Sequence, residues 1–207
     1  MKKIVCAILC ILLVSMAGCA KQNAPVQQPS EAPAAATETP AEGTVHHITI
    51  DVKNYGTISV ELDGVHAPIT VNNFISLAKA GFYDGLTFHR IISGFMIQGG
   101  DPKGDGTGGS DNTIKGEFSL NGVENPLSHT RGAISMARSK DYNSASSQFF
   151  IVHEDCAQLD GQYAAFGYVT DGMDIVDKIC ADTPVVDNNG TVEKENQPVI
   201  TSIKVVD

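Results

Sequence analysis

Short runs of alternating apolar and polar residues, separated by glycine-rich turns, constrain the fold of this chain most strongly. Residues 46–52, HHITIDV, place isoleucine and valine at every second position, as a half-buried β-strand does. Residues 57–62 and 199–206 alternate in the same way. The chain has 20 glycines and few long apolar runs, which favours strands and turns over a helix bundle. The pattern therefore predicts a fold made mainly of β-strands.

Two segments depart from this pattern and show the period of a helix. In the first, Pro68 suits the opening turn and Gly81 the C-terminal position, and apolar residues between them share one face. The second is predicted over Met173–Ala181. Further strands are expected around residues 87–92, 95–98, 132–136, 148–152 and 165–169. Many short strands with two helices predict a mainly β domain over residues 45–207, a closed antiparallel barrel capped at its ends.

Six sequence blocks in this domain carry a resemblance to a known family. They are APITVNNFISLAKAGFYDGLTFHRIISGFMIQGGDPKGDGTGG (67–109), GEF (116–118), RGAISMA (131–137), SSQFFI (146–151), LDGQYAAFG (159–167) and GMDIVDKI (172–179). Their order and spacing resemble the cyclophilin type of peptidyl-prolyl cis-trans isomerase over nearly the whole domain. The resemblance implies a closed eight-stranded antiparallel barrel with an α-helix at each end.

The implied reaction is rotation about an X–Pro peptide bond, whose barrier is about 20 kcal/mol. No bond is broken, so the reaction needs no nucleophile, metal or cofactor. The enzyme must bind the twisted amide more tightly than either planar form. A fixed cationic donor near the proline nitrogen would do this, and the resemblance assigns that catalytic role to Arg90 in FHR. A structural arginine paired with an acid would be the default for a lone arginine in a strand.

The resemblance also implies a set of substrate-binding residues around Arg90. They are apolar walls for the proline ring and polar groups along the peptide: Phe95, Met96, Gln98, Ala137, Arg138, Gln148, Phe150, Leu159 and Tyr163. Gln98 is expected to hold the orientation of Arg90. Gln148 and the backbone at Ala137 and Arg138 are expected to bind the peptide chain. Outside the motif, each apolar member would be assigned to the barrel core.

Three positions depart from the family pattern. Arg138 stands where many members carry Asn, Tyr163 where many carry His, and Gln158 where many carry Trp. The contact at Arg138 is expected through the backbone, so it survives the change. The missing Trp predicts weak cyclosporin binding and has less effect on catalysis.

We consider three classes of function for a chain of this size, of which the third is excluded. The first is a monomeric prolyl isomerase that speeds the folding of exported, proline-containing proteins. The second is a binding module that holds such segments as a chaperone or scaffold. The third, a solute-binding lipoprotein, would need two lobes, for which 207 residues leave too little chain.

The first residues read as a targeting segment rather than as part of the fold. Lys2 and Lys3 precede an apolar stretch too short to span a bilayer comfortably, and small residues follow directly before Cys19. This resembles a bacterial lipobox, and it predicts a lipoprotein signal peptide at residues 1–18, a lipid on Cys19 and a cell-membrane location on the extracytoplasmic face. An ordinary secretory signal or an uncleaved anchor is the alternative. Residues 19–44, rich in Pro, Ala and Gln, predict a disordered tether.

Two cysteines remain in the domain, Cys156 and Cys180. A compartment outside the cytoplasm permits a disulfide between them, but sequence does not place their Cα atoms within bridging distance. A disulfide and two separate thiols are both compatible with the sequence.

Other apparent motifs are better explained by loops and core packing. The formal charge of −10 disfavours nucleic acid as a partner. A G-x-G-x-x-G match ending at Gly109 lacks the strand and helix of a dinucleotide site, so we expect a surface loop with unusual backbone angles. The aspartates in that loop do not follow an EF-hand pattern. We expect His89 to be a packed, hydrogen-bonded core residue.

Overall fold

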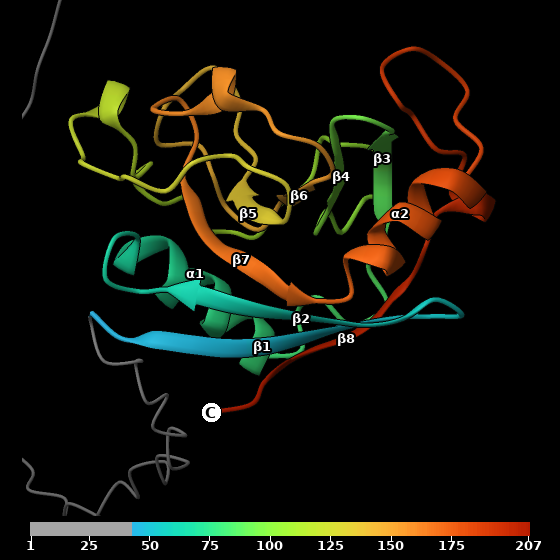
Figure 1. Ribbon diagram of the computed structural model, residues 1–207, viewed down its shortest axis with the longest axis horizontal. Helices are drawn as coiled ribbons and strands as arrows, with labels where there is room; N and C mark the ends of the chain where they lie inside the picture. The colour runs from blue at the N-terminus through green and yellow to red at the C-terminus, as the bar shows by residue number, and fades with distance from the viewer. Residues whose placement is uncertain (1–42) are drawn as a thin grey trace, which may run out of the picture. The chain divides into compact units, whose positions relative to one another are not determined.

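The computed structural model describes residues 43–207, which form an eight-stranded antiparallel sheet with two helices (Figure 1). The elements are β1 (Val45–Val52), β2 (Gly56–Asp63), α1 (Pro68–Lys79), β3 (Phe88–Ile92), β4 (Met96–Gly99), β5 (Ala133–Met136), β6 (Phe149–Val152), β7 (Ala165–Asp171), α2 (Met173–Asp182) and β8 (Ile200–Val205). The predicted mainly β fold with two helices is confirmed. The predicted signal peptide, Cys19 and nearly all of the tether lie outside the described residues.

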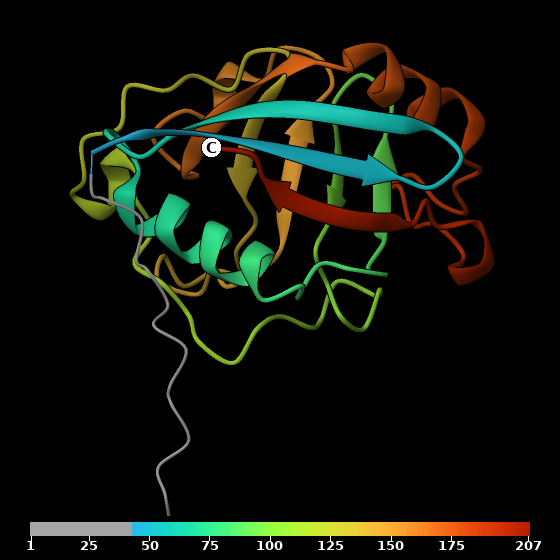
Figure 2. The ribbon, with the colours of Figure 1, turned by 90° about the horizontal axis from the view of Figure 1, so that it is seen from below.

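The sheet is curled but open, so the expected closed barrel is wrong. Its strand order is β3-β4-β6-β5-β7-β2-β1-β8, which leaves β3 and β8 as the two edges. The two edges meet only where these strands begin: Thr87 and Val199 form an isolated bridge, Phe88 N–H donates to the carbonyl of Pro198 (2.9 Å), and Ile200 N–H donates to that of Leu86 (2.8 Å). Beyond that point the free edge of β3 bonds to a loop instead of β8, because Ile91 N–H donates to the carbonyl of Gly190 (2.8 Å). The result is a half-barrel, visible from below in Figure 2.

The two faces of the sheet carry different apolar clusters. Alternation along β4 and β6 sends Ile97, Phe149 and Ile151 into the main core, where α1 also buries Phe74. Phe74 contacts the rings of three other buried aromatic residues, namely Tyr83, Phe149 and Phe166. The opposite face, here called the outer face, carries a smaller cluster that contains Met96 and Phe150. Because successive side chains of a strand point to opposite faces, the residues of the main core lie on one face of the sheet and the residues of the smaller cluster lie on the other.

Helix α1 begins without a side-chain cap of its own, since Ala67 occupies the N-cap position. Its first N–H groups are instead bonded by Glu117, which lies in a distant loop and is only 2% exposed. The Glu117 carboxylate accepts from Ile69 N–H (3.0 Å), Thr70 N–H (2.8 Å) and the Thr70 hydroxyl (2.7 Å). A buried anion thus completes the positive end of the helix.

The glycine-rich stretch is a loop folded around the carboxylate of Asp101. That carboxylate accepts from the backbone N–H groups of Lys103 (2.8 Å) and Gly106 (2.6 Å). Gly106 has a φ of +86°, so the predicted unusual backbone angles are confirmed. A Cβ on Gly108 would lie 2.0 Å from Asp101 Oδ1, which only glycine avoids.

Within residues 43–207, no helix has both the length and the apolar character needed to cross a membrane.

Candidate active site

The strand register places the predicted catalytic residues side by side on the outer face. Arg90 on β3 is paired with Gln98 on β4, and Gln98 is paired in turn with Phe150 on β6. Met96, two residues before Gln98, points to the same face. Residues sixty positions apart in the sequence thereby form one continuous row across three strands.

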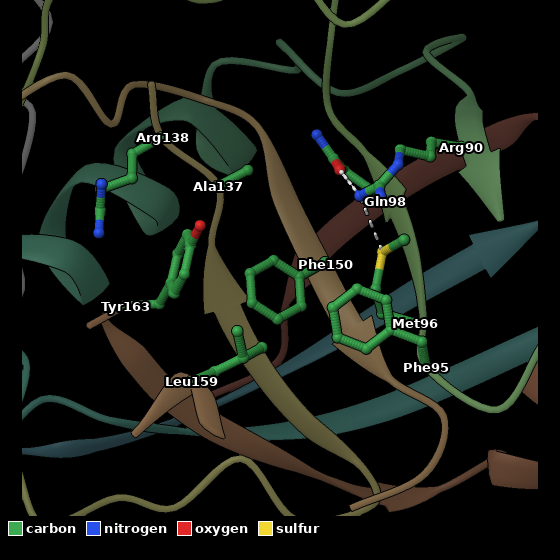
Figure 3. Close-up of a pocket in the computed structure, with 9 residues that line it drawn as sticks. All are labelled: Arg90, Phe95, Met96, Gln98, Ala137, Arg138, Phe150, Leu159 and Tyr163. Atoms are coloured by element: carbon green, nitrogen blue, oxygen red, sulfur yellow. Dashed lines mark hydrogen bonds between the residues drawn. The ribbon is translucent and has the colours of Figure 1, made fainter. Parts of the chain in front are cut away.

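This row forms the wall of a pocket of about 240 Å³, shown in Figure 3. The pocket is lined by nine of the ten predicted site residues: Arg90, Phe95, Met96, Gln98, Ala137, Arg138, Phe150, Leu159 and Tyr163. The tenth, Gln148, lines an adjoining polar pocket of about 260 Å³ together with Gln98, Ala137 and Arg138. The structure therefore brings the predicted residues into one groove made of two neighbouring pockets.

The apolar half of the groove is a well-packed hollow. Met96 and Phe150 are almost fully buried, at 2% and 5% exposure, while Phe95, Leu159 and Tyr163 are half-buried at the rim. The rings of Phe150 and Tyr163 meet edge to face, with centroids 6.0 Å apart. Such a hollow suits a compact apolar ring and offers few hydrogen-bonding groups of its own.

Arg90 is held above this hollow from two sides. Its Nη1 donates to Oε1 of Gln98 (3.2 Å), as predicted from the sequence. Its Nε donates to the backbone carbonyl of Asn189 (2.8 Å), and its Nη2 donates to Oδ1 of the same residue (3.3 Å). Burial lowers the pKa of Arg90, while Tyr163 and Asp187 act in the opposite direction. The guanidinium remains charged at neutral pH.

Asn189 is a site residue that the sequence did not reveal. It lies in the loop after α2, about one hundred positions from Arg90, and no sequence pattern connects the two. The contact depends on the fold, because the loop that contains Asn189 packs against the free edge of β3.

A chain of side-chain amides links Arg90 to the glycine-rich loop. Gln98 Nε2 donates to Oε1 of Gln148 (2.9 Å), and Gln148 Nε2 donates to the carbonyl of Gly108 (2.7 Å). Each amide fixes the rotamer of the next, so the acceptor offered to Arg90 is preorganised. Gln148 therefore acts on Arg90 through Gln98, and it also lines the second pocket.

Behind Phe150 lies a buried polar group that the sequence analysis also missed. The His129 ring stacks on the Phe150 ring at a centroid distance of 6.0 Å. Its Nδ1 contacts Oδ1 of Asp160 (2.8 Å) and its Nε2 contacts Oγ of Ser135 (2.9 Å). Burial lowers the pKa of His129, and its hydrogen bond to Asp160 opposes that shift. Because Ser135 is fully buried, this Ser-His-Asp chain supports the pocket wall and offers no nucleophile to a substrate.

The side chain of Arg138 makes contacts within the protein. Its guanidinium lies over the rings of Tyr163 (4.6 Å), Tyr142 (4.9 Å) and Phe118 (5.1 Å). It also donates twice to the carbonyl of Gln162, at 3.1 and 2.7 Å. In Figure 3 the guanidinium lies beside Tyr163 and away from Arg90. These contacts hold the Tyr163 rim in place, and they leave the backbone for the predicted role of Arg138 in peptide binding.

The other polar residues singled out in the sequence lie outside the groove. Cys156 and Cys180 are free thiols, and burial raises the pKa of Cys180 to about 11. His89 is buried, but neither ring nitrogen has a hydrogen-bond partner among the described residues, so the expected hydrogen bonding is wrong. Gln158 is exposed and does not line the pocket. Among residues 43–207, no group of three His, Cys, Asp or Glu side chains could hold a metal ion.

The arrangement combines a fixed cation with an apolar hollow on an open groove. A sequence profile described as "Cyclophilin type peptidyl-prolyl cis-trans isomerase/CLD" matches residues 47–205. A peptidyl-prolyl cis-trans isomerase of Helicobacter pylori is 47% identical over 128 residues, which cover 61% of this chain and 76% of the relative. Peptidyl-prolyl cis-trans isomerase B of Bacillus subtilis is 48% identical over 139 residues, which cover 67% of this chain and 87% of the relative.

Solved structures agree with these relatives. The crystal structure of a cyclophilin-type isomerase from Cryptosporidium parvum matches with a TM-score of 0.70 at 30% identity, covering 79% of this chain and 99% of that one. A second structure of that protein, in the presence of the dipeptide Ala-Pro, gives a TM-score of 0.69. This chain belongs to the cyclophilin-type peptidyl-prolyl cis-trans isomerases. It is an enzyme of the isomerase class that acts on X–Pro peptide bonds.

Proposed function

We propose that Arg90 is the catalytic residue and that the apolar hollow holds the proline ring. The supporting observation is that Arg90 is clamped over that hollow by Gln98 and Asn189. When the X–Pro amide twists, its nitrogen becomes pyramidal and its lone pair no longer conjugates with the carbonyl. A fixed guanidinium donates to that lone pair only in the twisted state, so it stabilises the transition state more than either planar form.

The energy required of this arrangement is modest. Uncatalysed exchange takes roughly 10–100 s at 25 °C. Lowering the barrier by about 5 kcal/mol brings the exchange to the order of 10 ms. A charge-assisted hydrogen bond to the nitrogen, in a hollow from which the proline ring excludes water, supplies about half of that, and holding the ring while the acyl side turns supplies the remainder.

The test is a protease-coupled proline-peptide assay on the wild type and on Arg90→Ala. The chain has three arginines, and Arg131, which pairs with Asp177 away from the pocket, provides a matched control. We expect Arg90→Ala to lose at least a hundredfold in kcat/KM, and Arg131→Ala to stay within threefold once folding is verified. Equal losses in both variants would rule out the catalytic role of Arg90.

A binding module is the second candidate, because the groove extends beyond the proline hollow into the polar pocket with Gln148. The Arg90→Ala variant separates the two. Loss of isomerisation with unchanged binding of an unfolded, proline-rich client and an unchanged cellular phenotype would favour the module. Loss of both activity and phenotype favours the enzyme.

We further propose that the enzyme is a lipoprotein on the extracytoplasmic face of the cell membrane, where it assists the folding of exported proteins. The proposal rests on the lysine-apolar-Cys19 pattern and on the Pro- and Ala-rich residues 19–44. Mass spectrometry of the mature chain should find a lipid on Cys19, and Cys19→Ser should release the protein from the membrane fraction. A mature chain that keeps residues 1–18 would contradict it.

Two further properties complete the proposal. We expect a monomer, which size-exclusion chromatography with light scattering will test. We expect weak cyclosporin binding, because exposed Gln158 offers no aromatic surface at the groove. Nanomolar inhibition of the wild type would contradict this expectation, and Gln158→Trp should raise the sensitivity.

A further inference from the structure

The loop at residues 183–192 supplies two of the three hydrogen bonds from the Arg90 guanidinium to oxygen acceptors. Asn189 accepts from Nε and Nη2, and Gln98 accepts from Nη1. A guanidinium has five N–H groups, so these three bonds leave two, one of which makes only a weak contact from Nη1 to Sδ of Met96 (4.0 Å). The bond from Nε to the Asn189 carbonyl is the shortest of the three, at 2.8 Å. The position of that carbonyl therefore decides where the remaining N–H groups point.

The loop has its own internal brace, the side chain of Asp187. Its Oδ1 accepts from Asn189 N–H (2.9 Å) and Thr191 N–H (3.0 Å), and its Oδ2 accepts from the Thr191 hydroxyl (2.9 Å). The hydrogen bonds from Thr191 hold the pKa of Asp187 below its ordinary value, so it is a carboxylate at neutral pH. Three donors converge on one side chain and fix the turn that presents Asn189.

The braced loop is attached to the strand that carries Arg90. Gly190 adopts a φ of +80°, and its carbonyl accepts from Ile91 N–H at 2.8 Å. Thr191 forms an isolated bridge with Arg90 itself. A Cβ at Gly190 would lie 2.3 Å from the carbonyl oxygen of Ile91, so the close approach requires glycine. The loop is thus tied to the backbone of β3 on both sides of Arg90.

We propose that Asp187 is a positioning residue for the isomerase, which acts through Asn189 to aim Arg90 at the proline nitrogen. This inference rests on the catalytic role proposed for Arg90. An arginine side chain has many rotamers, and an unsupported guanidinium would spend most of its time away from the productive geometry. Because Asp187 is exposed and its hydrogen bonds stay within the loop, its removal should loosen the loop without unfolding the sheet.

The kinetic test compares Asp187→Ala, Asp187→Asn and the control Asp182→Ala. Asn keeps an oxygen for the two backbone N–H groups and an amide that can donate to Thr191 Oγ, but it removes the charge. Asp182→Ala removes another exposed carboxylate, at the end of α2. We expect Asp187→Ala to lower kcat about tenfold with little change in KM, and the other two variants to stay within twofold. Equal activity of Asp187→Ala and Asp182→Ala would overturn the proposal.

A double mutant tests whether the effect passes through Arg90. In an Arg90→Ala background, adding Asp187→Ala should change the residual catalysed rate by less than twofold. A full tenfold loss there would show that Asp187 acts elsewhere and would overturn the proposal.

An NMR measurement tests the geometry without relying on activity. With three arginines in the chain, the Nε–H region contains three assignable signals. The Arg90 Nε–H signal should exchange slowly with solvent in the wild type and in Asp187→Asn, and rapidly in Asp187→Ala. An unchanged signal in Asp187→Ala would overturn the proposal. If the wild type shows the protected signal but no isomerase activity, the proposed function of Arg90 fails while the loop contact stands.

Discussion

The buried carboxylate of Glu117 is expected to contribute several kilocalories per mole to the folded state, and Glu117→Ala tests this. The substitution removes the acceptor of two backbone N–H groups and one hydroxyl at the start of α1. Thr70 is fully buried, so its N–H and hydroxyl would stay unsatisfied, whereas Ile69 is 42% exposed and its N–H can bind water. Each unsatisfied buried group costs about 1–3 kcal/mol. We therefore expect a loss of about 3 kcal/mol in the free energy of unfolding.

This loss should be visible in thermal melts. A domain of this size loses about 2–4 °C in Tm per kcal/mol, so Glu117→Ala should melt about 10 °C below the wild type. Glu117→Gln keeps one acceptor oxygen and should lose about half as much. Glu124→Ala, at an exposed acid of the same loop region, is the control and should change Tm by less than about 1 °C.

Glu117→Ala also distinguishes an effect on stability from an effect on catalysis. Glu117 does not line either pocket of the groove, so kcat/KM per folded molecule should be unchanged at temperatures below the melt. A Tm within 2 °C of the wild type would refute the reasoning, because it would mean that water or a rearranged cap satisfies α1 equally well. Circular dichroism with urea denaturation gives the free energy independently of Tm.

Three further predictions concern single positions. Burial holds the pKa of His129 below its unfolded value near 6.5. Its contribution to stability is therefore fully present above about pH 6.5 and is lost as the pH falls toward the folded pKa. The free energy of unfolding from urea denaturation should decrease from pH 7.5 to 5.5, and a flat profile would contradict this. Gly108→Ala should destabilise the domain by about 2 kcal/mol, because its Cβ would meet the Asp101 carboxylate at 2.0 Å; a Tm equal to the wild type would disprove it. Phe150→Leu should lower kcat/KM about tenfold, because the flat wall of the hollow is lost; full activity in the protease-coupled assay would remove Phe150 from the proline site.

The sequence predicted the elements well because their signals are local. Alternation identified the strands, and Pro68 with Gly81 bounded the first helix to within two residues of the observed Pro68–Lys79. The family blocks then identified residues that the register brings together, including Arg90 and Phe150. Their pairing through Gln98 follows from strand register, which alternation alone does not fix.

What the sequence did not predict depends on long-range contacts. The open edge of the sheet arises because residues 190–192 occupy the place that a closed barrel would give to β8. The same loop brings Asn189 to Arg90, and no local pattern in a loop encodes such a contact. His129 was missed for a similar reason, since its partners Asp160 and Ser135 come from a separate loop and strand. The His89 ring, which has no hydrogen-bond partner within residues 43–207, also departs from the general tendency of buried polar groups to find partners.

The position of the groove on the outer face of the sheet has a consequence for what the enzyme can act on. The hollow proposed for the proline ring is separated from the core by the sheet itself, so we expect a polypeptide to cross the surface without being threaded through the protein. Neither end of the client needs to be free, and chain length on either side of the proline is unrestricted. A proline within a long, partly folded chain, or within a loop closed by a disulfide, is therefore as accessible as one in a short peptide, provided that a few residues around it can lie extended.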